Sequence, residues 1–379
     1  MRVLHVISDR NIGGAGVLLT TLLQHFDNTK IESIVALPHD SQLIGRLESI
    51  GVSMRFLYAD CDRFHWKSVR ELRSIIEQEA IDIVHANAAI SARIAGKLSH
   101  KIVVHTRHCC FPPSGIWKNR AVCKIGGRIN NMLSDRVIAT ADAAAENLKL
   151  LGIPASSIEV IVNGSMPIRA VSDAELNAFL EKYHLQKKDF FIGICARLEE
   201  CKGHDVFLRA AKLVLEQKNM PKPVFLIIGN GSQRLTLEKM AEELGIAERV
   251  KFLGFVEDMA LVYRILRLNV NCSRGTETSC LALSEGMSAG VPFVASDFGG
   301  NRAMCGESMA GMLFPVDDER ALADHICEIL TDPSLEAKMR EAALKRYQKK
   351  YTAEQMSEHL AAVYEELYHA KYEGSGLRQ

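Results

Sequence analysis

The chain has 379 residues, of which 47% are hydrophobic and 24% are charged, and this length suits two well-cored domains better than one. Its 46 basic and 46 acidic residues leave no net charge, which argues against nucleic acid as a partner. No apolar stretch approaches the roughly 20 residues that span a bilayer, and no signal peptide precedes the first predicted strand, so we expect a cytoplasmic protein.

The first 106 residues alternate between strand and helix patterns. Residues 2–8 form a predicted strand, followed by a turn that contains Gly13 and Gly14 and by a helix ending near residue 26. Glycines at such a turn let backbone N–H groups approach an anionic or polar ligand, although their spacing is not the dinucleotide fingerprint. Further alternating segments are predicted at 33–37, 41–50, 54–57, 66–79, 81–85, 90–98 and 102–106. The alternation predicts a parallel sheet with helices on both faces.

Histidines lie at the ends of two consecutive predicted strands. His85 ends one strand, and His105 and His108 end the next. An open α/β sheet binds its ligands at the carboxyl ends of its strands. These histidines therefore indicate either a polar cleft or satisfied structural residues, and the sequence leaves both readings open.

A basic segment, 114–136, follows the second histidine strand. Its cationic residues alternate with apolar ones, and it contains Trp117. It could contact anionic lipid, but an ordinary packed helix with a solvated face is the favoured interpretation. Residues 136–139, 143–151 and 158–162 then predict strand, helix and strand. Because the charged stretch 169–188 shows no periodicity, we predict an N-terminal domain at 1–168 and a C-terminal domain at 169–351.

The second half begins with a predicted strand at 190–196, and two cations follow it. Arg197 and Lys202 lie just before a predicted helix at 204–216. Arginine can hold two phosphate oxygens in its planar fork, and lysine acts as a mobile point charge. Together they could neutralise a diphosphate without a metal ion. The ten cysteines show no paired metal-ligand spacing and are expected to be buried thiols, so no metal is predicted.

Two carboxylates, Glu277 and Glu285, lie in a predicted βαβ unit of strand 266–272, helix 279–289 and strand 292–296. Glu277 precedes the helix among three candidate capping residues, Thr276, Thr278 and Ser279. Glu285 is predicted about two turns into a small, apolar helix, where it is poorly placed as a surface charge. We therefore expect Glu285 to face a cleft and to accept hydrogen bonds from hydroxyl groups. Later segments predict a strand at 311–315, helices at 319–330, 333–350 and 352–372, and a tail-like end.

The E-x7-E spacing of Glu277 and Glu285 and the R-x4-K pattern of Arg197 and Lys202 resemble the retaining GT-B glycosyltransferases of the family 4 group, also called glycosyl transferases group 1. An Asn-Gly pair, here at 163–164, precedes the linker in that family. The resemblance covers nearly the whole chain and is most specific in the C-terminal half. It implies an α/β protein with the GT-B fold: two Rossmann-like, doubly wound parallel-sheet domains facing across a cleft. Helix 352–372 would cross back to the N-terminal domain.

The resemblance also implies a function. The chain would move a hexose-type sugar from a nucleoside diphosphate sugar, a UDP-sugar, to a hydroxyl acceptor, with retention of anomeric configuration and without a metal or other cofactor. The acceptor would be a sugar or lipid-linked sugar of cell-envelope polysaccharide or glycolipid biosynthesis, so peripheral contact with the inner, anionic face of the membrane is also expected. The N-terminal half would select the acceptor.

The family motifs assign roles to residues of this chain. The expected catalytic residues are Arg197, Lys202, Glu277 and His108. The expected nucleotide-sugar-binding residues are Gly13, Gly14, Gly229, Phe255, Val256, Thr278, Ser279 and Glu285. Of these, Glu285 would hold the ribose, Glu277 the sugar hydroxyls, and the residues at 255 and 256 would line the nucleobase pocket.

The sequence departs from the family pattern at two places. Asn87 stands where a second histidine is common, and Asn301 and Arg302 follow Gly299–Gly300 where many members continue toward an acidic residue. The second departure leaves the identity of the donor sugar open. Two rival functions share the expected architecture: a nucleotide-sugar 2-epimerase, for which no convincing acid–base pair is evident, and a non-catalytic nucleotide-sugar-binding subunit, against which the intact motif residues argue.

Overall fold

The computed structural model describes residues 1–59, 64–108, 115, 119–218, 220–275 and 277–373. Its internal contacts divide the chain into two units. One unit consists of Met1–Gly164 and the C-terminal segment that begins at Ala353, and the other is Ser165–Thr352. The sequence-based boundary lay four residues later, between 168 and 169. None of the described helices is long and apolar enough to cross a membrane.

The first unit contains a seven-stranded parallel sheet in the order β3-β2-β1-β4-β5-β6-β7. Its strands are β1 (Arg2–Ile7), β2 (Glu32–Pro38), β3 (Ser53–Leu57), β4 (Ile83–Asn87), β5 (Ile102–Arg107), β6 (Arg136–Ala139) and β7 (Ile158–Val160). The chain runs outward from β1 in one direction and then from β4 in the other, as in a doubly wound fold. The central strands are buried and apolar because helices cover both faces of the sheet.

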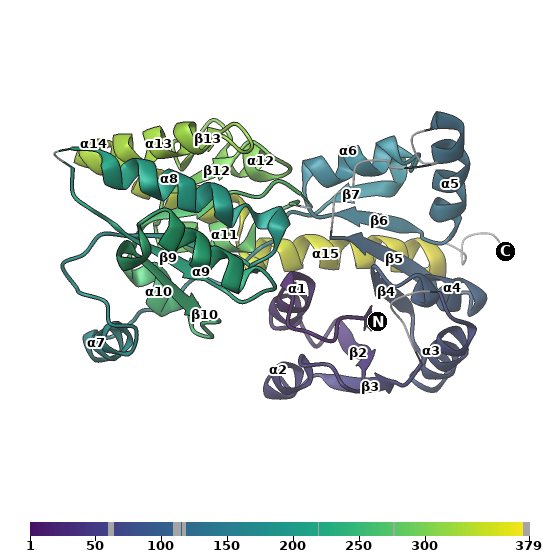
Figure 1. Ribbon diagram of the computed structural model, residues 1–379. Coiled ribbons are helices and arrows are strands. Elements are labelled where there is room, and N and C mark those ends of the chain that lie inside the picture. Colours follow the sequence, from purple (N-terminus) through teal and green to yellow (C-terminus); the bar gives the residue numbers. More distant parts are fainter. Residues whose placement is uncertain (60–63, 109–114, 116–118, 219, 276, 374–379) are drawn as a thin grey trace. The chain divides into compact units, whose positions relative to one another are not determined.

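The helices of the first unit are α1 (Gly14–Leu23), α2 (Ile44–Ser49), α3 (Trp66–Gln78), α4 (Ile90–Leu98), α5 (Arg120–Met132), α6 (Asp142–Leu150) and α15 (Ala353–Tyr368). They lie on the two faces of this sheet (Figure 1). α15 packs on the sheet through Tyr364, which is fully buried and is hydrogen-bonded to His85 of β4. The C-terminal helix is therefore part of the N-terminal unit, as the predicted fold class requires.

The second unit repeats the arrangement with a six-stranded parallel sheet in the order β10-β9-β8-β11-β12-β13. Its strands are β8 (Phe191–Cys195), β9 (Val224–Ile228), β10 (Val250–Gly254), β11 (Leu266–Asn271), β12 (Phe293–Ser296) and β13 (Gly311–Phe314). Its helices are α7 (Asp173–Lys182), α8 (His204–Glu216), α9 (Arg234–Glu243), α10 (Met259–Ile265), α11 (Leu281–Ser288), α12 (Asn301–Cys305), α13 (Glu319–Thr331) and α14 (Pro333–Lys350). Two Rossmann-like parallel-sheet units confirm the predicted fold class.

Two local predictions were wrong. Residues 169–188 contain α7, whose start is fixed by a capping box between Ser172 and Glu175. The many charges of this segment hid a short apolar face, Leu176, Phe179 and Leu180, which is buried. The N-cap of α11 is Cys280, without a side-chain cap, so neither Thr278 nor Ser279 caps the helix, and Thr276 lies outside the described residues.

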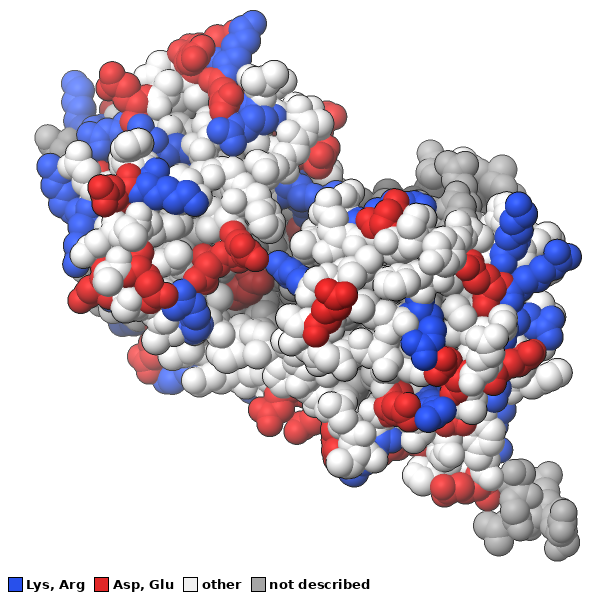
Figure 2. All heavy atoms as spheres, turned by 90° about the horizontal axis from the view of Figure 1, so that it is seen from below, with Lys and Arg blue, Asp and Glu red and all other residues white. Residues whose placement is uncertain are grey.

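On the face drawn in Figure 2, lysine and arginine side chains are interspersed with aspartate and glutamate. This mixture agrees with the equal numbers of basic and acidic residues in the sequence. No field of one sign covers that face.

Candidate functional site

The candidate site lies within the second unit, at the carboxyl ends of the two central neighbouring strands, β8 and β11. Arg197 follows β8, and Lys202 lies in the short 3-10 helix Glu200–Lys202 before α8. Glu277 lies in the loop between β11 and α11. Because β8 and β11 are paired in parallel, their loops emerge at the same edge of the sheet.

Lys202 and Glu277 form a nearly buried ion pair. Lys202 Nζ donates to Glu277 Oε2 at 2.8 Å, and their side chains are 18% and 8% exposed. Burial opposes the ionised form of each group, but the opposite charge and the hydrogen bonds around the pair together more than offset it. The pKa of Lys202 is therefore raised and that of Glu277 lowered. Both groups are charged at neutral pH.

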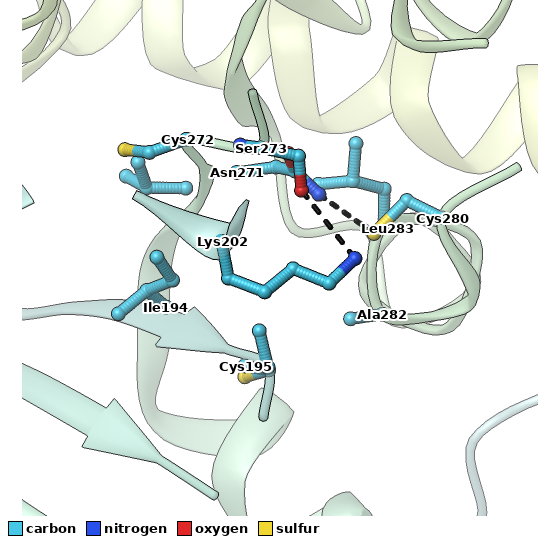
Figure 3. Close-up of a pocket in the computed structure, with 11 residues that line it drawn as sticks. Ile194, Cys195, Lys202, Asn271, Cys272, Ser273, Cys280, Ala282 and Leu283 are labelled. Atoms are coloured by element: carbon cyan, nitrogen blue, oxygen red, sulfur yellow. Dashed lines mark hydrogen bonds between the residues drawn. The ribbon is translucent and has the colours of Figure 1, made fainter. Parts of the chain in front are cut away.

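Figure 3 shows the Lys202 side chain extended across a small pocket toward Ser273, with Cys280 and Ala282 nearby. Ser273 Oγ lies 3.5 Å from Nζ and also donates to Glu277 Oε2 at 2.8 Å. Three thiols line the pocket, those of Cys195, Cys272 and Cys280, and burial raises the pKa of each. These thiols are therefore protonated at neutral pH and weakly nucleophilic.

Arg197 is exposed, and within the described part of the chain no side-chain hydrogen bond or ion pair involves it. Its backbone is held by the glycine loop after β9, since Leu198 N donates to Asn230 O at 3.0 Å. Gly229 has a φ of 134°, and a Cβ at that position would lie 2.1 Å from Ala196 O. The predicted Gly229 turn thus supports the strand end that presents Arg197.

The turn that carries Lys202 also needs a glycine. Gly203 has a φ of 68°, and a Cβ there would lie 2.2 Å from the carbonyl oxygen of Cys272. Only glycine lets this turn pack directly on the end of β11. This close packing brings Lys202 within reach of the Glu277 loop.

The loop that carries Glu277 is fixed from its other side by Gly299 and Gly300. A Cβ at Gly299 would lie 2.0 Å from Glu277 O, and one at Gly300 would lie 1.5 Å from Thr278 O. Thr278 and Ser279 are themselves buried. The glycine pair therefore packs against the loop backbone that leads into α11.

Glu285 is the fifth residue of α11, about one turn from its start rather than two. Its Oε2 lies 3.1 Å from the hydroxyl of Tyr263, which is also 2.9 Å from Ala282 O. Tyr263 is buried in α10, and burial raises its pKa well above the usual value. Sequence reasoning missed Tyr263, which supports Glu285 as a neutral hydroxyl.

The two residues predicted to line a nucleobase pocket follow β10. Phe255 is 58% exposed, whereas Val256 is buried in the hydrophobic core between α7, α10 and the sheet. Phe255 can therefore offer an aromatic face to a ligand, but Val256 could contribute mainly through its backbone.

The remaining predicted residues belong to the first unit. Gly13 is the N-cap of α1 and Gly14 its first residue, directly after the loop that follows β1. His108 Nε2 lies 3.0 Å from Asn87 Oδ1, and burial lowers its pKa to about 4. His85 is fully satisfied, because its ring nitrogens contact Tyr364 and Thr106, so it is a structural residue. His105 was the alternative candidate for the role assigned to His108. It is buried, and its ring contacts Ala86 O at 3.2 Å.

Two family models match successive parts of the chain. One, for glycosyl transferases group 1, matches residues 177–346. The other, Glycosyltransferase Family 4, matches residues 12–165. Together they cover most of both units.

In the described ranges, no group of three or more His, Cys, Asp and Glu side chains could hold a metal ion.

Similar proteins include an Escherichia coli UDP-Gal:alpha-D-GlcNAc-diphosphoundecaprenol alpha-1,3-galactosyltransferase, 26% identical over 277 residues, which cover 71% of each chain. The lipopolysaccharide core biosynthesis mannosyltransferase LpcC of Rhizobium leguminosarum is 30% identical over 244 residues, 62% of this chain and 65% of that one. Among solved structures, Anabaena HepE in complex with UDP-glucose superposes with a TM-score of 0.83 at 20% identity, covering 97% of this chain and 100% of HepE. Sucrose-phosphate synthase from Thermosynechococcus elongatus gives 0.78 at 17% identity, with 98% and 100% covered. These structural likenesses show the fold.

Proposed function

This chain belongs to the family 4 group of glycosyltransferases, which use nucleotide sugars, and from that premise we propose that it transfers a sugar from a UDP-sugar to a hydroxyl group with retention of configuration and without a metal ion. The observation that best supports this proposal is the nearly buried Lys202–Glu277 pair together with the exposed Arg197, all at the carboxyl edge of the second sheet. The acceptor we propose is a glycan or lipid-linked sugar of the cell envelope.

The proposed chemistry is electrostatic. When the sugar–phosphate bond breaks, negative charge develops on the leaving diphosphate, and preorganised cations stabilise it. The exposed Arg197 guanidinium can hold two phosphate oxygens. Lys202 Nζ has three donors, and its contacts with Glu277 and Ser273 leave one to reach a phosphate oxygen. The start of α11 supplies further backbone donors.

The proposed donor contacts follow from the placement of the two glutamates. Glu277 would accept hydrogen bonds from sugar hydroxyls while it also pairs with Lys202. Glu285, which accepts a hydrogen bond from the Tyr263 hydroxyl, would accept hydrogen bonds from the ribose hydroxyls. Phe255 would contact the base. The choice of uridine is supported by HepE, which was solved with UDP and with UDP-glucose, and by the galactosyltransferase, whose name gives a UDP-sugar donor. The roles of Gly13, Gly14 and His108 in the first unit stay predictions.

The relatives' names support the proposed acceptor. The Escherichia coli enzyme is named for a diphosphoundecaprenol-linked sugar, and LpcC for lipopolysaccharide core biosynthesis. Retention follows the family pattern in this proposal: the acceptor would attack on the face from which the diphosphate leaves, and a phosphate oxygen would take its proton.

A panel of nucleotide sugars tests this function. We expect the purified protein to release UDP from one UDP-sugar when an envelope lipid extract is added, and to keep that activity in EDTA because Arg197 and Lys202 carry the charge stabilisation. Anomeric analysis of the product by NMR would report the configuration. A strict requirement for a divalent metal, or release of nucleotide from none of the donors, would contradict the proposal.

The same panel separates the rival functions. A 2-epimerase would convert the donor without any acceptor. A binding subunit would convert no donor, with or without the acceptor. The similarity of fold does not favour the epimerase, since the superposition on a structure described as a UDP-N-acetylglucosamine 2-epimerase from Listeria monocytogenes has a TM-score of 0.65 at 15% identity and shows architecture alone. Both matched family models describe transferases.

The two glutamates should respond differently to replacement by glutamine. Glu285 contacts a part of the donor that does not react, so Glu285→Gln should raise the donor KM and leave turnover largely intact. Glu277→Gln removes the charge opposite Lys202 beside the reacting carbon, where a misplacement of about 1 Å can cost on the order of a hundredfold in turnover. Steady-state kinetics would measure the donor KM and kcat of both variants, and calorimetry would measure their affinity for UDP. Glu242→Gln, on the exposed face of α9, is the control. Normal turnover by Glu277→Gln would contradict its assignment.

We also propose that α5 contacts an anionic membrane surface. Three of its apolar side chains are exposed, Ile125 at 62%, Ile129 at 58% and Met132 at 76%. Lys124 and Arg128 are exposed on the same side of the helix: they are four residues apart, and Arg128 lies three residues after Ile125 and four before Met132. Such a face can bury apolar groups at the acyl boundary while its cations meet anionic headgroups. Ser114, Trp117 and the neighbouring predicted contacts lie outside the described residues.

Liposome sedimentation tests the membrane contact. The protein should sediment with phosphatidylglycerol vesicles at low salt and less so at high salt, because exposed charges are screened within about 10 Å at 0.1 M. Replacing Ile125 and Ile129 with serine should reduce the bound fraction several-fold. Leu235→Ser, which alters an even more exposed apolar residue of α9, should leave the bound fraction unchanged. Equal binding by both variants would leave α5 without this role.

A further inference from the structure

A group of buried polar side chains lies behind Glu277, and the proposed contacts with the donor do not account for it. Asn271 and Ser273 lie at and just after the end of β11, Ser296 ends β12, and Asn301 begins α12. Their exposed fractions are at most 6%. Buried polar groups are costly unless they are hydrogen-bonded, so the pattern of their bonds is informative.

Two of these residues contact the carboxylate directly. Ser273 Oγ donates to Glu277 Oε2 at 2.8 Å, and Asn271 Nδ2 lies 3.4 Å from the same oxygen. Asn271 Nδ2 also lies 3.0 Å from Cys280 Sγ, at the N-cap of α11. Oε2 of Glu277 is therefore surrounded by three donors from two segments: Lys202 before α8, and Asn271 and Ser273 at the end of β11.

Asn301 and the backbone of Ser273 together fix which way the Asn271 amide faces. Asn271 Oδ1 accepts from Ser273 N at 2.9 Å and from Asn301 Nδ2 at 3.2 Å. With two donors on its oxygen, Asn271 must turn its NH₂ group toward Glu277. A reversed amide would place Oδ1 against a carboxylate oxygen and Nδ2 against two donors.

Asn301 is itself fixed by β12. Its Nδ2 donates to Ser296 O at 3.0 Å, and Ser296 Oγ donates to Ser273 O at 2.6 Å. Arg302, the other residue at this departure from the family pattern, is exposed and ion-paired with Asp297. Of Asn301 and Arg302, only the buried Asn301 is hydrogen-bonded to the residues around Glu277.

We propose that Asn301 and Asn271 are positioning residues for sugar transfer. Asn301, together with the backbone N–H of Ser273, fixes the orientation of the Asn271 amide. That amide and the Ser273 hydroxyl hold Glu277, and through it Lys202, in the geometry that the reaction needs. The proposal rests on the proposed function of this site. It assigns no substrate contact to either asparagine.

The charged and titratable groups that face Glu277 define what a pH profile can report. They are Lys202, paired with it, and the thiols of Cys280 and Cys201 beside the pair. Burial keeps the Cys280 thiol protonated by raising its pKa to about 12. His204, next to the turn that carries Lys202, is also titratable, and burial lowers its pKa to about 4. Protonation of Glu277 should therefore contribute to the acid limb of the turnover profile together with that of His204, over the pH range in which the protein stays folded.

The first test replaces the donor that faces Glu277. Asn271→Asp keeps the shape but puts a carboxylate oxygen next to Glu277 Oε2, so the acid limb of kcat should move to higher pH and turnover at neutral pH should fall about tenfold or more. Asn269→Asp is the matched control. Asn269 lies two residues earlier on β11, is equally buried, and donates to Ala282 O instead. Thermal melting should show similar losses of stability in the two variants, while only Asn271→Asp shifts the profile.

The second test removes the residue that acts at a distance. Asn301→Leu takes away the donor to Asn271 Oδ1, and it should shift the acid limb in the same direction by a smaller amount, with Asn269→Leu as its control. In an Asn271→Ala background, Asn301→Leu should change kcat no further, because its effect passes through Asn271. Profiles of the Asn271 and Asn301 variants that match those of their controls would overturn the proposal. Inactivity of the unmodified protein with every nucleotide sugar would instead overturn the proposed function.

Discussion

Replacing Arg197 with alanine should reduce turnover about a hundred- to a thousandfold, as the loss of one preorganised donor to a developing negative charge does in other enzymes. Arg197 is exposed and has no ion-pair partner in the described part of the chain, so its removal should hardly affect stability. UDP affinity measured by calorimetry should fall as well, but by a smaller factor, since charge on the diphosphate grows as the bond breaks. Arg264→Ala, at an exposed arginine of α10, is the matched control.

Lys202→Ala should cause a comparable loss of turnover. This variant also leaves Glu277 buried without its cation, so a second variant is needed to separate a loss of stability from a loss of catalysis. Breaking a buried ion pair from one side commonly costs about 3–5 kcal/mol of stability. The double variant Lys202→Ala with Glu277→Gln removes both charges, so it should recover much of the stability and none of the activity. Near-normal turnover by Arg197→Ala or by Lys202→Ala, in folded protein, would contradict the diphosphate assignment.

The sequence predicted the elements around the site well where strong local patterns occur. The apolar runs of β11 and β12 and the break at Gly290 and Pro292 placed strand, helix and strand within about two residues of their observed bounds. The Arg197 and Lys202 pattern was recognisable because it follows a buried strand. α7 was missed because its charges outnumber the three apolar residues that it buries.

Contacts between distant segments could not be predicted from local patterns. Lys202 and Glu277 are 75 residues apart in the sequence, and they meet because β8 pairs with β11 across the point where the strand order reverses. His85 looked like a site residue at a strand end, but a tyrosine 279 residues later satisfies it. Asn271 carried a usable indication, since a polar residue that ends a buried strand at the ligand-binding edge needs a partner. Nothing local indicated that its partner would be Asn301.

Acidification should destabilise the protein well before its carboxylates are protonated. His5, His105 and His204 are buried, and burial lowers their pKa values to about 3, 3 and 4. In the unfolded chain a histidine titrates at about 6.5. Below that pH these histidines are protonated in the unfolded state but stay neutral in the folded state. Their contribution to the free energy of unfolding is therefore fully present above about pH 6.5 and is lost as the pH falls toward the folded pKa values.

At pH 5, each of these histidines should cost about 2 kcal/mol relative to pH 7.5, or about 6 kcal/mol in all as an upper estimate. That loss is comparable with the total stability of about 5–15 kcal/mol typical of a folded protein. Two of the three histidines, His5 and His105, lie in the first unit, so that unit should be the more acid-sensitive. The ion-paired Glu277, whose pKa is lowered, should add its own loss only at still lower pH.

His5 offers the sharpest test of this acid sensitivity. It is fully buried among Phe26, His85 and Tyr364, and neither of its ring nitrogens has a hydrogen-bond partner among the described residues. His5→Phe keeps an aromatic ring there but cannot be protonated, so urea unfolding at pH 7.5 and pH 5 should show a difference smaller by about 2 kcal/mol than in the unmodified protein. His39→Phe, at an exposed ring stacked on Tyr58, should leave the full difference. If the unmodified protein is equally stable at both pH values, or if His5→Phe retains the whole difference, His5 is not held neutral by burial.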